Sequence, residues 1–240
     1  MTTASGLAGP PPSGTAVPEL VREHAGGAGL SGVWLNQLGG LTFRAADHFL
    51  KWSPPGVDLT PEFERLGWAG VWHPVPDVVT FVDEGDRGQL LVTQALAGRS
   101  AVDPRWMRDP LRAVWAIGEG LRALHENLPV AACPFVWFPM QQAELPMADH
   151  LVVAHGDPCA PNTIVDDQGH WVGHVDLGRL GVGDRWIDLA VGSANLDGNF
   201  GPGYQDEYFA AYGIDRDEDR IRFYRELWDR SDQPSDTPAP

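Results

Sequence analysis

The stretch that decides the fold of this 240-residue chain reads VAHGDPCAPN and occupies residues 153–162. It separates an acid, Asp157, from an amide, Asn162, by four residues. A short apolar run precedes the stretch, and a pattern typical of a β-hairpin follows it. That hairpin ends on a second acid, Asp176. The sequence therefore predicts a single site that gathers oxygen-bearing side chains.

The order of these side chains has a chemical meaning. A kinase catalytic loop has an acid, four intervening residues and an Asn, and its metal-binding Asp follows after a hairpin. This chain has the same order. Asp157 would orient or deprotonate a hydroxyl, and Asn162 and Asp176 would offer the hard oxygen ligands that Mg²⁺ prefers. A structural interpretation of any one residue stays open, because Asp157 can cap a turn and Asn162 can form an Asx-turn. The ordered set favours phosphoryl transfer.

Outside this stretch, the chain divides into a β-rich front and an α-rich back. Strand signals in the front fall at residues 33–38, 48–52, 78–83 and 89–95. A helix follows Thr60-Pro61, with Pro61 at its first turn. In the back, helices are expected from residue 103 onward and over residues 187–196, 203–212 and 217–228. The first of these has an apolar stripe made of Met107, Leu111, Val114, Ile117, Leu121, Leu124 and Leu128. The pattern predicts a two-lobed α+β architecture.

Composition sets the expected limits of the lobes. Gly, Pro, Ser and Thr dominate residues 1–18, and a similar composition returns over residues 231–240. We expect both ends to be disordered. The N-lobe, an antiparallel sheet with one helix, would cover residues 19–94, and a mainly helical C-lobe would cover residues 95–230.

Charge and composition narrow the classes of partner. The chain has 17 basic and 33 acidic residues and a net charge of −16 at pH 7. Such a charge repels nucleic acid and anionic membranes and attracts polycations. The sequence shows neither a membrane-spanning apolar run nor a signal-peptide pattern, so we expect a cytoplasmic protein. The two cysteines, Cys133 and Cys159, are too few for a disulfide framework.

Further stretches carry a resemblance to a known family. VDLGRLGVGDRWIDLA occupies residues 175–190, YGI residues 212–214 and CPF residues 133–135. With the HGD and PN segments of the catalytic stretch, they resemble the aminoglycoside phosphotransferases, most closely the branch that modifies a 3′-hydroxyl. The resemblance implies a protein-kinase-like fold, with ATP or GTP and Mg²⁺ bound by the N-lobe and the catalytic residues. It also implies O-phosphorylation of a cationic small molecule, an aminoglycoside, and therefore antibiotic resistance.

The resemblance assigns roles to residues of the C-lobe. Asp157 matches the family's catalytic aspartate, and Asn162 and Asp176 match its magnesium ligands. Arg179 matches an arginine near the active site. Asp188, on the next predicted helix, is interpreted as a structural acid that braces the catalytic loop by hydrogen bonds.

In the N-lobe, the resemblance points to the phosphates of the nucleotide. Lys51, the one lysine of the sequence, matches the lysine that binds the α- and β-phosphates. Its ion-pair partner should lie on the following helix, where Glu62 is the first choice and Glu64 the alternative. A surface lysine and a first-turn glutamate near a helix N-terminus would be the structural interpretation of the same residues.

Two more segments of the N-lobe match nucleotide-binding parts of the family. Gly39, Gly40 and Thr42 lie where the family folds a loop over the phosphates, although the loop is short here. Thr93 and Ala95 lie where the family joins its lobes, and their backbone groups are expected to bond adenine.

The chain also departs from the family. Most of a helical segment that binds the drug's amines in the 3′ branch is missing from residues 136–154, where Glu144 and Asp149 are the acids present. The acidic C-terminal end survives in part as Glu226 and Asp229, which we expect to face substrate.

Another departure lies just after the core helix. Close relatives have an Arg-Asp pair where this chain has Ala194-Asn195. These changes leave two alternatives open: a kinase of another small hydroxylated molecule, and a catalytically silent nucleotide-binding module.

Overall fold

The computed structural model describes residues 8–137 and 145–231. They form two compact units, one made of residues 8–70 and 76–95 and the other of residues 71–75, 96–137 and 145–231. Residues 71–75 thus belong with the second unit, because the Pro74 carbonyl accepts the His174 N–H and the His73 ring contacts His174. The expected lobe boundary at residue 94 left residues 71–75 in the N-lobe, whereas they belong to the second unit.

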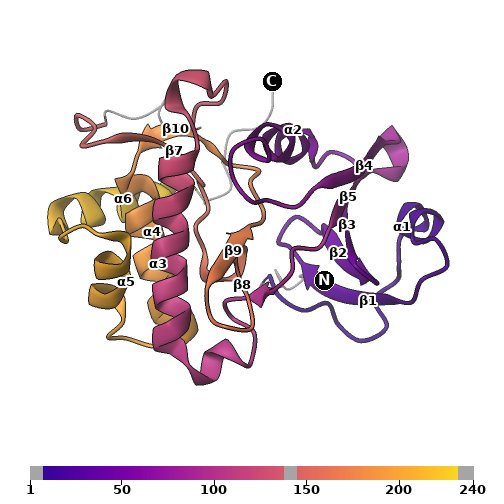
Figure 1. Ribbon diagram of the computed structural model, residues 1–240. Helices are drawn as coiled ribbons and strands as arrows, with labels where there is room; N and C mark the ends of the chain where they lie inside the picture. Colours follow the sequence, from indigo (N-terminus) through magenta and orange to yellow (C-terminus); the bar gives the residue numbers. More distant parts are fainter. Residues whose placement is uncertain (1–7, 138–144, 232–240) are drawn as a thin grey trace, which may run out of the picture. The chain divides into compact units, whose positions relative to one another are not determined.

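The first unit is built on a five-stranded antiparallel sheet in the order β1-β2-β3-β5-β4. The strands are β1 (Leu30–Leu35), β2 (Leu41–Ala45), β3 (His48–Ser53), β4 (Val78–Asp83) and β5 (Gln89–Gln94). Two helices, α1 (Glu19–His24) and α2 (Thr60–Ala69), complete it. Figure 1 labels these elements. The strand β2 and the helix α1 were not predicted from the sequence.

Alternation along the strands gives this sheet two different faces. One face packs against α1, and its buried apolar residues are Leu20, Val21, Leu41, Phe43, Ala45, Leu50, Leu90 and Val92. Lys51 pairs with Thr42 on β2 and with Leu91 on β5, so these three side chains share the opposite face. The packing of one face therefore positions Lys51 and Thr42 together on the other.

Part of the N-terminal arm, which we expected to be disordered, pairs with the sheet. Gly9 exchanges backbone hydrogen bonds of 3.0 and 2.7 Å with Leu35 at the edge of the sheet. Backbone pairing of this kind needs no apolar side chains, so the composition of residues 1–18 could not reveal it. Residues 1–7 and 232–240 lie outside the described residues, and α6 ends at Ser231.

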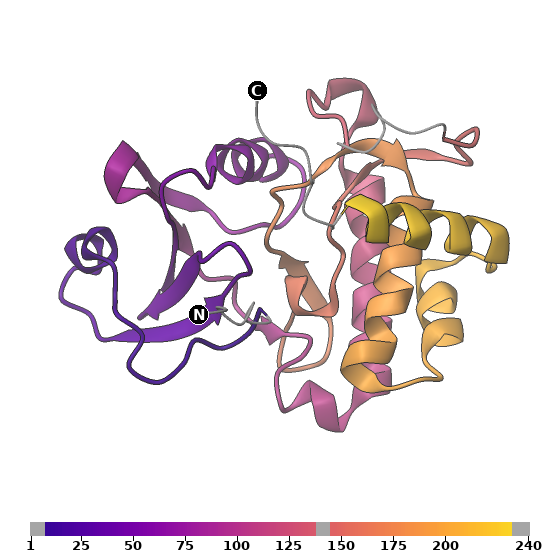
Figure 2. The same ribbon diagram turned by 180° about the vertical axis from the view of Figure 1, so that it is seen from behind.

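The second unit is mainly helical. Its helices are α3 (Pro110–Asn127), α4 (Trp186–Phe200), α5 (Gln205–Tyr212) and α6 (Glu218–Ser231). The helix α3 packs against α5, which lies beside it in Figure 1, and α4 packs against α6, which crosses it in Figure 2. Gly118 allows the first of these contacts, because a Cβ there would lie 2.7 Å from the Cβ of Ala211. The core of the unit includes Trp106, Ile117, Leu121, Trp137, Trp186 and Tyr208.

Short strands complete the second unit. β7 (Leu151–Ala154) pairs with β10 (Gly181–Asp184), and β8 (Thr163–Val165) lies between β6 (Arg99–Ser100) and β9 (Trp171–His174). β10 was not predicted, because its GVGD sequence lacks the apolar alternation of a strand. Among the described residues, no helix combines the length and apolarity needed to cross a membrane.

The apolar stripe predicted for the long helix is wrong at its beginning. α3 starts at Pro110, and Met107 belongs to a preceding 3₁₀ turn, Trp106–Arg108. Met107 and Leu111 are 41% and 47% exposed, whereas Val114, Ile117, Leu121 and the later members of the stripe are buried. Trp106, one residue earlier than expected, enters the core instead.

Candidate active site

Asp188 on α4 holds the first half of the candidate catalytic loop, residues 155–162. Its fully buried carboxylate accepts the backbone N–H of His155 at 2.6 Å and that of Gly156 at 2.9 Å. Nε2 of His125 lies 2.9 Å from the same carboxylate, and Tyr212 bonds the other side of that ring at 2.8 Å. The bracing role predicted for Asp188 is confirmed by these contacts.

Gly156 allows the turn that precedes Asp157. Its φ of 83° lies in the left-handed region, and a Cβ at this position would collide with the backbone of Arg179. Only glycine accepts both conditions without strain. The catalytic loop therefore packs directly on the segment that follows Asp176.

Asn195 holds the second half of the loop, a role that the sequence analysis missed. Its Oδ1 accepts the Ala160 N–H at 2.7 Å and also the side-chain amide of Asn199 at 2.8 Å. Asn195 lies seven residues after Asp188 on α4, which is two helical turns and therefore the same face. That spacing on a predicted helix was a signal that could have found it.

His155 connects the loop to the strand β9. Its Nε2 donates to the Val175 carbonyl at 3.1 Å, and its Nδ1 accepts the Asp157 N–H at 3.3 Å. These contacts fix one tautomer of the neutral ring. His155 therefore acts as a scaffold residue of the loop.

Two more buried histidines lie behind His155. Asn127 donates to Nδ1 of His73 at 3.2 Å, so Nε2 of His73 donates to Nδ1 of His174 at 2.9 Å. His174 meets His155 edge to face, and Trp171 stacks on His73. Burial, followed by the charges of His155 and His125, lowers the pKa of His73 to about 4.

This depressed pKa predicts a pH dependence of stability. The unfolded chain protonates His73 below its ordinary pKa of 6.5, whereas the folded protein resists protonation down to about 4. Stability contributed by neutral His73 is therefore complete above pH 6.5 and decreases as pH falls from 6.5 towards 4. Between neutral pH and pH 5 we expect a loss of about 2 kcal/mol from this residue.

Urea unfolding of the wild type and of His73→Gln at several pH values measures the effect. The variant should show a shallower decrease of unfolding free energy from pH 6.5 to pH 5. Equal slopes in the two proteins would show that His73 titrates as an exposed histidine does.

Asp157 lies at the centre of the loop with its carboxylate largely buried. Burial raises the pKa of Asp157, and the nearby charge of Asp176 raises it further, while a hydrogen bond from Cys159 works in the opposite direction. The thiol of Cys159 donates to Oδ1 of Asp157 at 2.8 Å. A carboxylate with a raised pKa is a stronger base than a solvated aspartate.

Asn162 and Asp176 meet beside Asp157. The Val175 N–H donates to the Asn162 carbonyl at 3.0 Å, which brings the residue before Asp176 against Asn162. The side-chain amide of Asn162 donates to the Asp157 carbonyl at 3.0 Å, so Nδ2 is engaged and Oδ1 is the atom suited to a cation. Asp176 has a φ of 62°, a strained conformation for a residue other than glycine and one that is concentrated at functional sites.

The first unit carries the expected ion pair. Nζ of Lys51 lies 2.6 Å from Oε2 of Glu62, whose residue is only 7% exposed. Glu64, the alternative partner, is exposed on the other side of α2. The pairing of Lys51 with Glu62 predicted from the sequence is therefore present.

The loop between β1 and β2 is closed by Asn36. Its Oδ1 accepts the N–H of Leu38 at 3.0 Å and that of Gly40 at 2.7 Å. Gly39 has a φ of 83°, which the tight turn requires. Thr42 follows in β2 opposite Lys51, as the register of the sheet dictates.

The backbone of Ala95 is already in use within the first unit. Its N–H donates to the Asp47 carbonyl at 2.7 Å, and the Gln94 side chain bonds the same carbonyl at 3.0 Å. A contact from Ala95 to adenine would thus come from its carbonyl rather than its N–H. Thr93 is buried in β5, paired with Phe49.

Arg179 and the acids of α6 lie in the second unit. The Arg179 guanidinium lies over the Trp228 ring, 4.7 Å from its centroid, a cation–π contact. Arg179 also contributes to the electrostatic environment of Asp157. Glu226 and Asp229, on either side of Trp228, are both exposed.

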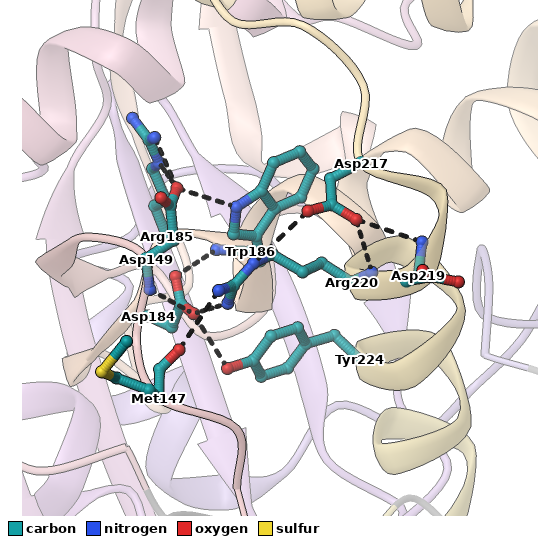
Figure 3. A network of polar contacts seen from close by, with 9 residues as sticks. All are labelled: Met147, Asp149, Asp184, Arg185, Trp186, Asp217, Asp219, Arg220 and Tyr224. Atoms are coloured by element: carbon teal, nitrogen blue, oxygen red, sulfur yellow. Dashed lines mark hydrogen bonds and ion pairs between the residues drawn. The ribbon is translucent and has the colours of Figure 1, made fainter.

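Figure 3 shows a second polar network, centred on the buried carboxylate of Asp184 at the end of β10. This carboxylate accepts from Arg220 at 2.9 Å, from the Tyr224 hydroxyl at 3.1 Å and from the Asp149 N–H at 3.1 Å. Arg220 also donates to the Met147 carbonyl at 3.2 Å. The network joins β10, α6 and the segment before β7.

Asp149 belongs to this scaffold. Its Oδ2 accepts from Nε of Arg185 at 2.7 Å and from Nε1 of Trp186 at 3.0 Å. The Asp149 carboxylate is therefore already bonded to Arg185 and Trp186. Glu144, the other acid of residues 136–154, lies outside the described residues.

Comparison with known proteins places the chain in a family. The streptomycin 3''-kinase of Streptomyces griseus is 33% identical over 273 residues, covering 90% of this chain and 96% of that protein. The chain belongs to the aminoglycoside phosphotransferase family. The aminoglycoside 3'-phosphotransferase of Streptomyces fradiae is also 33% identical, over 254 residues, covering 85% of this chain and 93% of that protein. The family resemblance seen in the sequence is thereby confirmed.

A solved structure and a family match extend the comparison. The aminoglycoside phosphotransferase APH(3'')-Id from Streptomyces rimosus is 30% identical with a TM-score of 0.70, covering 87% of this chain and 94% of that one. That protein has also been solved in complex with ADP and streptomycin. The family described as "Phosphotransferase enzyme family" matches residues 140–224. The expected kinase-like α+β fold of this phosphotransferase is confirmed.

Relatives also have residues that this chain lacks. The alignment with the Streptomyces griseus protein spans 273 residues and is therefore longer than this phosphotransferase of 240 residues. The absence of a segment from residues 136–154 stays a prediction.

Proposed function

We propose that this phosphotransferase moves the terminal phosphoryl group of ATP or GTP to a hydroxyl of an aminoglycoside, and so confers resistance to the drug. The observation that carries the proposal is the loop that holds Asp157, with its backbone bound by Asp188 at one end and by Asn195 at the other. A catalytic group fixed by buried hydrogen bonds loses no freedom at the moment of reaction.

The chemistry follows from Asp157. The acceptor hydroxyl gives its proton to the Asp157 carboxylate while its oxygen forms a bond to the γ-phosphorus. The bond from that phosphorus to the β–γ bridging oxygen breaks, and a nucleoside diphosphate leaves. Burial raises the pKa of Asp157, so the carboxylate is a stronger acceptor for this proton than an exposed aspartate.

Lys51 serves the phosphates of the nucleotide. Glu62 holds its ammonium group in place on the sheet face that also presents Thr42. A lysine is a compact point charge, which suits phosphate oxygens. Gly39 and Gly40 place the β1–β2 loop next to Thr42, and the carbonyl of Ala95 and the backbone of Thr93 are the proposed contacts for adenine.

The donor set fits Mg²⁺. Among the described residues, no group of three or more His, Cys, Asp or Glu side chains could hold a metal. An amide oxygen with a carboxylate is nonetheless what Mg²⁺ needs from protein, because it keeps waters and phosphate oxygens as its other ligands. Asp157 and Asp176 also lie close enough for one charge to raise the other's pKa. Asn162 and Asp176 would hold the ion, which neutralises charge on the phosphate oxygens.

The substrate is proposed from charge and from relatives. A net charge of −16 favours a cationic substrate such as an aminoglycoside. One relative is named for the 3' and one for the 3'' hydroxyl, and both are 33% identical to this chain. Exposed Glu226 and Asp229 on α6 would attract the drug's ammonium groups, and we place the reaction in the cytoplasm.

Expression in a sensitive bacterial host tests the proposal. The wild type should raise the inhibitory concentration of streptomycin, of kanamycin or of both, and purified protein with Mg·ATP should give a monophosphorylated drug. Phosphorus NMR of the product assigns the 3' or 3'' position. A protein that binds ATP yet gives neither resistance nor product with a panel of aminoglycosides would contradict the proposal.

The metal ligands make a further prediction. Asp176→Asn should weaken Mg²⁺-dependent nucleotide binding more than Asn162→Ala does, because a charged ligand neutralises more of the metal's charge. We expect a difference of about tenfold in affinity, or about 1.4 kcal/mol. Calorimetric titration of Mg·ATP measures it, with the exposed Asp167→Asn as control. Equal and small effects would place the metal elsewhere.

A further inference from the structure

Cys159 lies two residues after Asp157 and contacts it directly. Its thiol donates to Oδ1 of the Asp157 carboxylate at 2.8 Å. Burial, then the charge of Asp157, raises the pKa of the Cys159 thiol, so the sulfur carries its proton at neutral pH and acts as the donor. This is a side-chain contact between the proposed base and a group with no assigned role.

The backbone presents the thiol in a fixed position. Pro158 and Pro161 flank Cys159, and each proline ring locks its own φ. The next residue, Ala160, donates its N–H to Asn195 at 2.7 Å. The backbone is thus held on both sides of Cys159, which fixes the point from which its thiol reaches Asp157.

We propose that Cys159 is a positioning residue for phosphoryl transfer: by engaging Oδ1 of Asp157, its thiol sets the carboxylate so that Oδ2 faces the acceptor hydroxyl. The inference rests on the proposed function, since it assigns Asp157 the role of base. A thiol is a weak donor. It can therefore orient the carboxylate without competing for the negative charge as an arginine would.

The contact explains how one carboxylate can remain both fixed and reactive. Asp157 has two oxygens, and a base that rotates freely about χ2 would present either of them. The hydrogen bond to Oδ1 removes that freedom before substrate arrives. Effects of this kind appear in the rate of the chemical step and leave binding of the nucleotide unchanged.

Kinetics of three variants test the proposal. Cys159→Ala removes the donor, Cys159→Ser replaces it with a hydroxyl, and Cys133→Ala changes the second thiol, whose described hydrogen bond goes to the Phe135 carbonyl. We expect kcat to fall about tenfold in Cys159→Ala, the loss of one hydrogen bond to a charged group. KM for ATP should stay near the wild-type value. Cys159→Ser should recover most of the rate, and Cys133→Ala should match the wild type.

Three kinetic outcomes would overturn the proposal. One is an unchanged kcat in Cys159→Ala, and another is a Cys159→Ser variant as slow as Cys159→Ala. A rise in KM for ATP as large as the fall in kcat would also overturn it, because it would indicate general damage to the loop. Thermal unfolding of each variant shows whether the variant is folded under the conditions of the kinetic assay.

A spectroscopic measurement tests the contact without using turnover. The infrared S–H stretching band of Cys159 is obtained as the difference between wild type and Cys159→Ala. The band should move to higher frequency in Asp157→Ala, since the acceptor is gone. An unchanged band overturns the proposal even if the enzyme is active. If the wild type phosphorylates no aminoglycoside but the band shifts, the proposed function fails while the contact stands.

Discussion

Replacing Asp157 with alanine should reduce kcat by about 10²–10⁴-fold, the range expected when a general base is removed. The reason is local. Asp157 is a partly buried carboxylate in a loop that Asp188 and Asn195 hold in place. Its side chain should meet the acceptor hydroxyl and not the nucleotide. Affinity for Mg·ATP, measured by calorimetry, should therefore stay close to that of the wild type.

The control is the same change at an exposed acid. Asp215 lies on the surface between α5 and α6, and Asp215→Ala should leave kcat and both KM values unchanged. Turnover of Asp157→Ala within a few-fold of wild type would remove Asp157 from the mechanism. Loss of nucleotide binding equal to the loss of rate would assign it to the metal site instead.

The catalytic loop was predictable because its information is local. Asp157, Asn162 and Asp176 lie within 20 residues of each other, and the hairpin between β8 and β9 returns the chain to its start. The Lys51–Glu62 pair spans only 11 residues and joins a strand to the next helix. Spacing and element types predicted the first of these groups. The Lys51–Glu62 pairing was predicted from the family resemblance, because the residues by themselves also fitted a surface lysine and a first-turn glutamate.

The missed features depend on contacts between distant segments. Asn195 meets Ala160 across 35 residues, and the Ala95 N–H meets Asp47 across the sheet. The second contact requires a turn in which Ala46 adopts a φ of 53°. No sequence pattern marks alanine for that conformation. The bond from the Ala95 N–H to the Asp47 carbonyl therefore could not be predicted from the sequence.

The beginning of the apolar stripe is exposed, which its periodicity did not predict. Periodicity alone assigned Met107 and Leu111 to the core. The 3₁₀ turn at Trp106–Arg108 changes the direction of the chain before α3 begins at Pro110. Trp106 is thereby turned inward and Met107 outward. Met107 therefore lies outside the helix, whereas Leu111 is exposed although it belongs to the first turn of α3.

Replacing Asp188 with alanine should have the largest effect on stability of any change considered. The fully buried carboxylate accepts two backbone N–H groups, from His155 and Gly156, and contacts His125. Alanine would leave these groups unpaired where water does not reach. Each unpaired buried group costs about 1–3 kcal/mol. We expect a total loss of about 3–5 kcal/mol, as for other broken buried pairs.

Urea unfolding followed by tryptophan fluorescence measures this loss. Asp188→Asn is the informative companion, because it keeps the shape and one acceptor oxygen but turns an NH₂ group towards at least one of the loop donors. It should lie between wild type and Asp188→Ala. Asp197→Ala is the matched control, since this acid lies on the same helix but is exposed, and its side chain accepts a hydrogen bond from Gln205.

The three variants together separate two explanations. If Asp188 braces the loop, unfolding free energy should decrease from wild type through Asn to Ala, and the Asn variant should lose turnover even while folded. A loss of stability in Asp188→Ala no larger than in Asp197→Ala would show that the loop holds its conformation without the carboxylate. The position of Asp157 would then have to come from the remaining contacts of the loop. These include Asn195, the side chains of His155 and Asn162, and the packing of Gly156 on Arg179.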